Sequence, residues 1–139
     1  MTRPLIIWGG RVIAALFPVL ALSAQPFNFY GIWRIDTLVG FSEISISQEK
    51  LEKFLGERVV ISKSHLMVGN DNCKIRHLRE STLDTTQLLL EGYKADPKNA
   101  GVSLRTRILK IEPCGDVFQV GNDIVISKGG AFFRANRAK

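Results

Sequence analysis

The residue types best suited to metal or redox chemistry are the two cysteines, Cys73 and Cys114, and the two histidines, His65 and His77. Cys73 and His77 are separated by three residues, a spacing that two ligands of one zinc ion could use. An even number of cysteines in an oxidising compartment favours a disulfide instead. We therefore predict a Cys73–Cys114 bond, worth roughly 3–4 kcal/mol in the chain-entropy model for a loop of about 40 residues. We expect no metal site.

Anion binding is the second chemistry that the residue types suggest. Arg105 and Arg107 alternate along a predicted strand, 104–111, and share a face with its apolar residues. Two arginines on one face offer forked donors for carboxylate or phosphate groups. The polar stretch 93–101, which begins with Tyr93 and Lys94, is predicted to be the longest mobile loop. We expect binding at this rim, although strand arginines also protect sheet edges against aggregation.

Patterns for covalent catalysis or nucleotide binding are not evident. The chain has no Gly-x-Ser-x-Gly elbow, no Ser-x-x-Lys with its companion motifs and no Gly-x-Gly-x-x-Gly fingerprint. Asp36 and Glu43 could serve as paired carboxylates, but the alternative is that both are solvated strand acids. These observations favour a protein that is not an enzyme and needs no cofactor.

The N-terminus predicts export. Arg3 and Arg11 precede an apolar run over 12–22. Ala21-Leu22-Ser23-Ala24 then supplies small residues for cleavage by a signal peptidase. The run is shorter than the roughly 20 apolar residues of a membrane-spanning helix, so we expect no anchor after cleavage. Residues 1–24 are thus predicted to be a signal peptide and 25–139 a single periplasmic or secreted domain. The net charge of +6 is too modest to indicate nucleic-acid binding.

The remaining pattern is mainly β. Alternation over 31–40 predicts a first strand with Trp33 facing the core. Ser47 is suited to cap a short helix that ends near Gly56. The stretch 84–92 suits a short helix opened by an Asp84–Gln87 capping box, or else a buried strand. With several further short strands closed by turns, the sequence predicts a small antiparallel β-barrel of about seven or eight strands with one or two short helices.

The opening of the first strand, Gly31-Ile32-Trp33, resembles the Gly-x-Trp signature of lipocalins and other calycins. In that superfamily the tryptophan closes the base of the barrel, often under an arginine from the last strand. The resemblance assigns this structural role to Arg134, within Phe132-Phe133-Arg134. It implies a ligand cup or a protein-binding rim. One departure is that the predicted helix follows the first strand, whereas lipocalins carry their main helix after the barrel.

Taken together, these features predict an exported, non-catalytic binding protein, and we expect a monomer. Its partner would be another protein, which it could block as an inhibitor or immunity protein, or a small apolar ligand. Two alternatives stay open: a hydrolase acting on the cell envelope through an unrecognised site, and a structural accessory of an envelope assembly.

Overall fold

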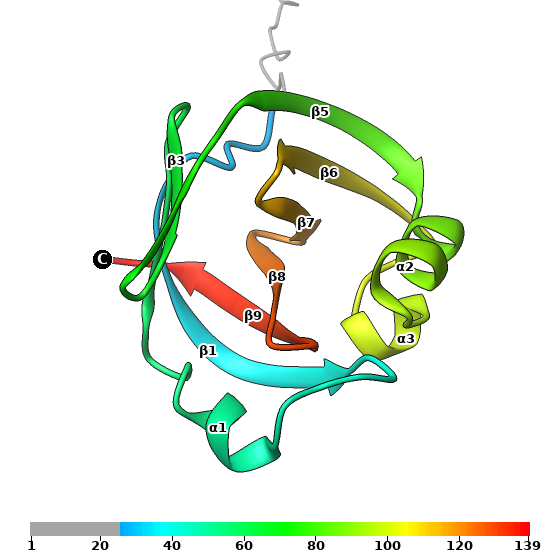
Figure 1. The fold of residues 1–139 in the computed structure, drawn as a ribbon. Helices are drawn as coiled ribbons and strands as arrows, with labels where there is room; N and C mark the ends of the chain where they lie inside the picture. The colour runs from blue at the N-terminus through cyan, green and yellow to red at the C-terminus, as the bar shows by residue number, and fades with distance from the viewer. Residues whose placement is uncertain (1–25) are drawn as a thin grey trace, which may run out of the picture.

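A computed structural model describes residues 26–139, so the predicted signal peptide lies outside the described residues. This part of the chain is mainly β: nine strands form one antiparallel sheet, with three short helices. The sheet curls through 265° into an open half-barrel, as Figure 1 shows. The elements in chain order are β1 (Gly31–Phe41), α1 (Gln48–Glu52), β2 (Arg58–Ile61), β3 (His65–Val68), β4 (Asp71–Lys74), β5 (His77–Asp84), α2 (Thr85–Tyr93), α3 (Pro97–Ala100), β6 (Arg105–Glu112), β7 (Gly115–Val120), β8 (Asp123–Lys128) and β9 (Ala131–Arg137).

The half-barrel is open between two strands that are consecutive in the chain. The strand order is β4-β3-β2-β1-β9-β8-β7-β6-β5, so β4 and β5 are the two edges. Cys73 in β4 lies opposite Leu66, whereas Leu78 in β5 lies opposite Ile111. Leu66 and Ile111 both belong to the hydrophobic core on the concave, inner face of the sheet. Odd-numbered residues therefore face inward in β4, and even-numbered residues face inward in β5. The mainly β, antiparallel fold is confirmed, but the sheet is an open half-barrel of nine strands with three short helices, where the sequence predicts a barrel of about seven or eight strands with one or two short helices.

The predicted disulfide is confirmed. Cys73 and Cys114 are bonded, with their Cα atoms 5.9 Å apart. Cys73 belongs to the edge strand β4, and Cys114 lies in the turn between β6 and β7. Because β6 is the neighbour of the other edge strand, the bond ties one edge of the curl to the region beside the other.

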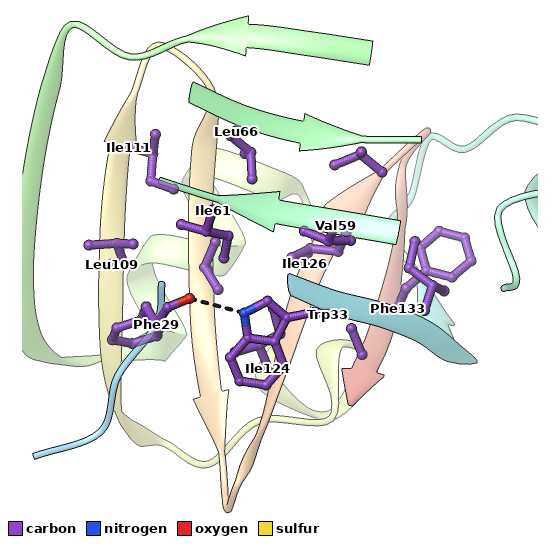
Figure 2. Packing of buried hydrophobic residues seen from close by; sticks show 14 of the residues in the cluster. Phe29, Trp33, Val59, Ile61, Leu66, Leu109, Ile111, Ile124, Ile126 and Phe133 are labelled. Atoms are coloured by element: carbon purple, nitrogen blue, oxygen red, sulfur yellow. Dashed lines mark hydrogen bonds between the residues drawn. The ribbon is translucent and has the colours of Figure 1, made fainter. Parts of the chain in front are cut away.

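The concave face of the sheet holds the larger of two hydrophobic cores. Trp33, predicted to be buried, has no exposed surface, and the inward residues of β2, β6, β8 and β9 surround it. Figure 2 shows its indole amid this cluster. These side chains pack closely and fill the interior of the half-barrel around Trp33. The buried cluster comprises Phe29, Trp33, Ile35, Leu51, Val59, Ile61, Leu66, Val68, Leu109, Ile111, Val117, Ile124, Ile126, Ala131, Phe133 and Ala135.

The convex face carries a second core under α2 and α3. Leu89 of α2 packs with Phe118, Val125 and Phe132, which point outward from β7, β8 and β9. Helix α3 lies so close to β1 that a Cβ placed on Gly40 would be 2.2 Å from a backbone oxygen of α3, so only glycine fits there. The sheet therefore has two buried faces near α2 and α3.

The segment 93–101 is not the long irregular loop that its composition predicts. It holds the end of α2 and all of α3, and Asp96 and Asn99 form a reciprocal capping box. Proline at the first turn suits a helix start because its missing N–H would be unpaired there anyway. The polar residues of this segment thus cap a helix that packs on the sheet.

The two other helices occur where the sequence predicts them. Ser47 caps α1, accepting a hydrogen bond from the Lys50 N–H, and the helix ends at Glu52, before Gly56. Asp84 caps α2 by accepting from the Thr86 N–H. The predicted partner in a capping box, Gln87, instead donates its side-chain amide to Glu91 one turn later. One side-chain acceptor therefore suffices to start α2.

Candidate binding pocket

The end of the half-barrel that carries Trp33 is closed by the chain that precedes β1. The indole Nε1 of Trp33 donates to the Phe29 carbonyl at 3.0 Å, and the guanidinium of Arg137 lies 3.9 Å from the centroid of the indole ring. Arg137 also donates to the carbonyls of Asn28 (2.7 Å) and Tyr30 (2.8 Å). One arginine thus stacks on the core tryptophan and satisfies two backbone acceptors of the closing segment.

This arrangement corrects the role predicted for Arg134. Arg134 lies on the outer face and forms an ion pair with Asp123, with 2.8 Å between nitrogen and oxygen. The register places Arg137 directly opposite Trp33, while Arg134 pairs with Thr37 beyond an irregularity in β1. Because side chains alternate along a strand, two residues three positions apart point to opposite faces.

The opposite end of the half-barrel, where the disulfide lies, is hollow. A pocket of about 250 Å³ opens there between the two sides of the curl. Its apolar walls are Leu66 and Val68 from β3, Val117 from β7 and Ile126 from β8, and the disulfide borders it. All four apolar residues face inward and belong to the inner core. They are already nearly buried, with 0–8% of each residue exposed, so a ligand in the pocket would gain mainly close contacts with them.

The polar side of this pocket includes an ion pair as well as Asp116 and Ser127. The ammonium of Lys128 is hydrogen-bonded to the carboxylate of Asp71, and it lies 5.7 Å from the centroid of the Phe54 ring. The Lys128 side chain is 25% exposed and that of Asp71 is 71% exposed. The hydrogen bond from Lys128, and next its charge, lower the pKa of Asp71. The contact with Phe54 thus holds the Lys128 side chain in place, while the carboxylate of Asp71 lies in solvent and can leave the ammonium.

Tyr93, one of the predicted binding residues, also lines the pocket. Its hydroxyl donates to the Asp116 carboxylate at 2.6 Å, and its ring packs against Phe118 and Phe132. Burial raises the pKa of the Tyr93 phenol, and the charge of Asp116 raises it further. Its neighbour Lys94 is exposed and caps α2 in a left-handed conformation with φ of 54°. Tyr93 therefore presents a fixed, neutral edge to the pocket.

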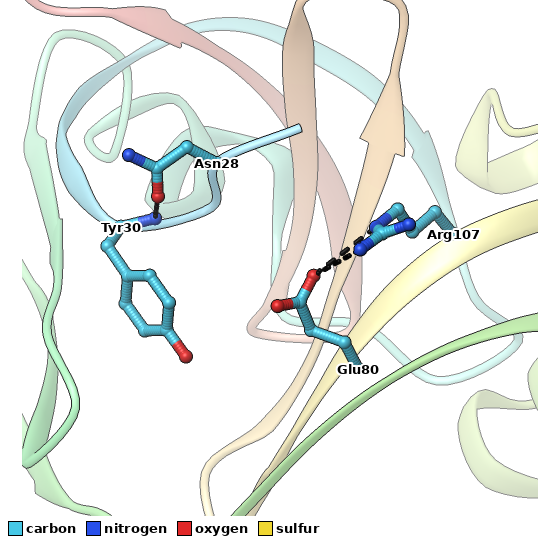
Figure 3. Close-up of polar contacts among 4 residues, drawn as sticks. All are labelled: Asn28, Tyr30, Glu80 and Arg107. Carbon is cyan, nitrogen blue, oxygen red and sulfur yellow. Dashed lines mark hydrogen bonds and ion pairs between the residues drawn. The ribbon is translucent and has the colours of Figure 1, made fainter. Parts of the chain in front are cut away.

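The predicted arginine pair is at the other end of the sheet. Arg105 is exposed, and Arg107 forms an ion pair with Glu80 at 3.0 Å. Figure 3 shows this pair near Tyr30, whose phenol pKa is raised by burial and by the nearby Glu80 carboxylate. Arg107 lines an open depression of about 600 Å³ that Arg137 also borders. The structure thus separates the predicted arginines from Tyr93 and Lys94.

The pocket residues that the sequence analysis does not single out are Leu66, Val68, Asp71, Gly115, Asp116, Val117, Ile126, Ser127 and Lys128. The alternation of apolar residues in the strands places the four aliphatic ones on the inner face. The hollow itself depends on how far apart β3 and β8 lie across the curl, for which the sequence carries no local signal.

Among the described residues, one histidine and both cysteines have partners within the protein. His65 hydrogen-bonds through its Nδ1 to the Ser64 hydroxyl at 2.9 Å, and the disulfide occupies both cysteines. Over residues 26–139, histidine, cysteine and acidic side chains form no group of three arranged to hold a metal ion. Within the same range, every helix is too short or too polar to cross a membrane.

Comparison of the chain with protein-family models, curated proteins and solved structures finds no match to any of them.

Proposed function

We propose that this chain is an exported, non-catalytic binding protein that holds a small ligand with an apolar body and a carboxylate in the pocket at the disulfide end. The observation that carries the proposal is the pairing of four inward aliphatic side chains with a half-buried lysine at one hollow. Ligand pockets combine mostly apolar walls with a few placed polar groups in this way.

The size of the pocket defines the class of ligand. Its volume of about 250 Å³ is just below the range of roughly 300–1,000 Å³ for drug-sized ligands. A short-chain or single-ring compound fits this volume, whereas a long-chain lipid exceeds it. The filled interior around Trp33 supports the same limit, since a longer ligand would have to displace packed aromatic side chains.

Lys128 is the one cation among the described residues that line the pocket, beside the carboxylates of Asp71 and Asp116, and a ligand carboxylate would take the place of Asp71 on its ammonium. Lys128 keeps its position through the Phe54 ring as well as through Asp71. The Asp71 side chain is 71% exposed, and an ion pair with a solvent-exposed partner contributes little to stability, so replacing the Asp71 carboxylate by that of a ligand costs little. A ligand whose apolar body fills the pocket would gain the ammonium contact, close packing against the four aliphatic walls and the removal of its own apolar surface from water.

The proposal includes export of the protein and a calycin-like origin of its half-barrel. The N-terminal pattern over 1–24 and the disulfide are typical of an exported domain. The stacking of Arg137 on Trp33 supports a calycin-like relationship, in which strand β9 supplies the arginine and β1 the tryptophan. The relationship would be to an opened form of that barrel, since β4 and β5 leave it unclosed.

Calorimetric titration of residues 25–139 with hexanoate and benzoate tests the proposal, with hexan-1-ol and benzyl alcohol as uncharged counterparts. We expect the carboxylates to bind with dissociation constants in the millimolar range or below, and the alcohols to bind about tenfold more weakly. Lys128→Met should remove the difference between acid and alcohol. If neither series binds, or if the alcohols bind as tightly as the acids, the ligand class is wrong.

A matched pair of variants locates the binding. Val68→Phe places a ring in the pocket, whereas Met67→Phe places the same ring on the outer face of the same strand, where Met67 is 36% exposed. We expect the first variant to abolish hexanoate binding and the second to leave it unchanged. Equal affinities for the two variants would contradict binding in the pocket.

A further inference from the structure

The outer face of the sheet is covered over only part of its area. Helices α2 and α3 cover the convex side of β7, β8 and β9 and the far end of β1. Over β2, β3, β4 and the first half of β1, the outward side chains within residues 26–139 are exposed or half-buried. We call this region the open face, and define it by Ile32, Arg34, Arg58, Val60 and Met67.

An apolar row crosses the open face at right angles to the strands. Ile32 in β1 lies opposite Val60 in β2, and Val60 lies opposite Met67 in β3. Ile32 is 39% exposed and Met67 36% exposed. Aligned apolar residues left in water over three adjacent strands differ from the single exposed aliphatic residues of ordinary surfaces, and they mark interaction sites.

A basic pair borders this row on the next register position. Arg34 lies directly opposite Arg58, and its other cross-strand neighbour is Asn136 in β9. Neither arginine has an ion-pair partner among residues 26–139, and Arg34 donates only to the Gly56 carbonyl, at 2.7 Å. Like charges placed directly opposite each other destabilise a sheet.

A second basic pair in the same sheet shows how such charges are otherwise balanced. Arg79 in β5 lies opposite Lys110 in β6, and Lys110 lies opposite Asp116 in β7. An acidic residue thus completes that row within the sheet. The Arg34–Arg58 pair has no equivalent in its own row, which leaves two positive charges beside exposed apolar surface.

A shallow hollow of about 460 Å³ joins the basic pair to the apolar row, lined among others by Arg34, Arg58, Val60 and Met67. One acidic residue, Glu57, also borders the hollow, and its carboxylate lies against the backbone of Gly69. The two guanidinium groups outnumber this single carboxylate. The hollow is therefore suited to receive an apolar side chain whose neighbours carry negative charge.

We propose that the open face binds an acidic segment of a partner protein, which lays an apolar side chain on the Ile32–Val60–Met67 row and its carboxylates on Arg34 and Arg58. This inference is independent of the pocket. Charge complementarity identifies the occupant. A membrane surface fits less well because the residues of the open face include no tryptophan or phenylalanine for insertion.

Fluorescence anisotropy of a labelled peptide of alternating glutamate and phenylalanine tests the proposal, with a lysine–phenylalanine peptide of equal length as control. We expect residues 25–139 to bind the acidic peptide and to lose the binding as salt is raised. Arg34→Glu with Arg58→Glu should weaken it by about tenfold or more. Arg79→Glu with Lys110→Glu, which reverses the balanced pair elsewhere on the sheet, should change it by less than about twofold.

The apolar half of the proposal is tested separately by Val60→Thr with Met67→Ser, which should weaken the same peptide by about fivefold to tenfold. Circular dichroism checks that each variant keeps the wild-type fold. The inference is overturned if the acidic peptide fails to bind at low salt, or binds both charge-reversal variants equally. It is also overturned if vesicles of phosphatidylcholine and phosphatidylserine bind through Arg34 and Arg58 while the peptide does not.

Discussion

The guanidinium of Arg137 lies over the indole of Trp33 at 3.9 Å, and the same side chain donates to the carbonyls of Asn28 and Tyr30. We predict that Arg137→Ala lowers the free energy of unfolding by about 2–4 kcal/mol, because it removes a cation–π contact and two charged hydrogen bonds. Arg134→Ala, on the outer face of the same strand, should cost at most about 1 kcal/mol. Urea denaturation measures the free energy of unfolding of both variants. A larger loss for Arg134→Ala than for Arg137→Ala would contradict the role given to Arg137.

Asp71 should titrate below its usual range. Because the Lys128 hydrogen bond and charge lower its pKa from 3.8, the ionised form is favoured in the folded state. Its contribution to stability is then present above the unfolded pKa and lost as the pH falls through the folded one. Carboxyl-resolved NMR should give a midpoint below 3.8 in the wild type. The midpoint should move upward in Lys128→Met, and an unchanged midpoint would exclude the ion pair.

Tyr93 should stay neutral at alkaline pH. Burial and the Asp116 carboxylate raise its pKa above the usual value of 10.0, so its contribution to stability is present below that value and lost as the pH rises past it. We expect Tyr93→Phe to lower stability by about 1–2 kcal/mol near neutral pH and to reduce the loss of stability in alkali. Ultraviolet absorbance should detect less phenolate than for free tyrosine at the same pH. Full ionisation of both tyrosines in the folded protein near the usual value would contradict this.

The disulfide should hold β4 in place. Replacing Cys73 and Cys114 together by serine should lower the free energy of unfolding by about 2–4 kcal/mol. Backbone amides of β3 and β4 should then exchange with solvent faster relative to those of β8 and β9, because β4 forms one edge of the sheet. Uniform acceleration throughout the sheet would show instead that the bond acts only on the unfolded chain.

Features set by local sequence are predicted well. The alternation around Trp33 predicts β1 and its buried tryptophan, Asp84 marks the start of α2, and the cysteine count predicts the Cys73–Cys114 bond. Each depends on a pattern within a few residues or, for the disulfide, on the even number of cysteines.

Features that depend on register are not predicted. The choice of Arg137 over Arg134 follows from the register of β1 with β9. The barrel stays open because β4 and β5 do not pair with each other. The pocket and the Arg34–Arg58 pair arise where residues far apart in the chain meet across strands. These cross-strand contacts depend on the order and register of the strands, which sequence periodicity alone does not determine.

Methyl-resolved NMR during titration with hexanoate tests the pocket most directly. We predict that the methyl resonances of Leu66, Val68, Val117 and Ile126 shift together with one saturable curve, while those of Ile124, packed near Trp33, stay in place. Lys128→Met should weaken this curve. Shifts confined to surface methyl groups, or no shifts at hexanoate concentrations that saturate millimolar sites, would contradict the proposed binding function.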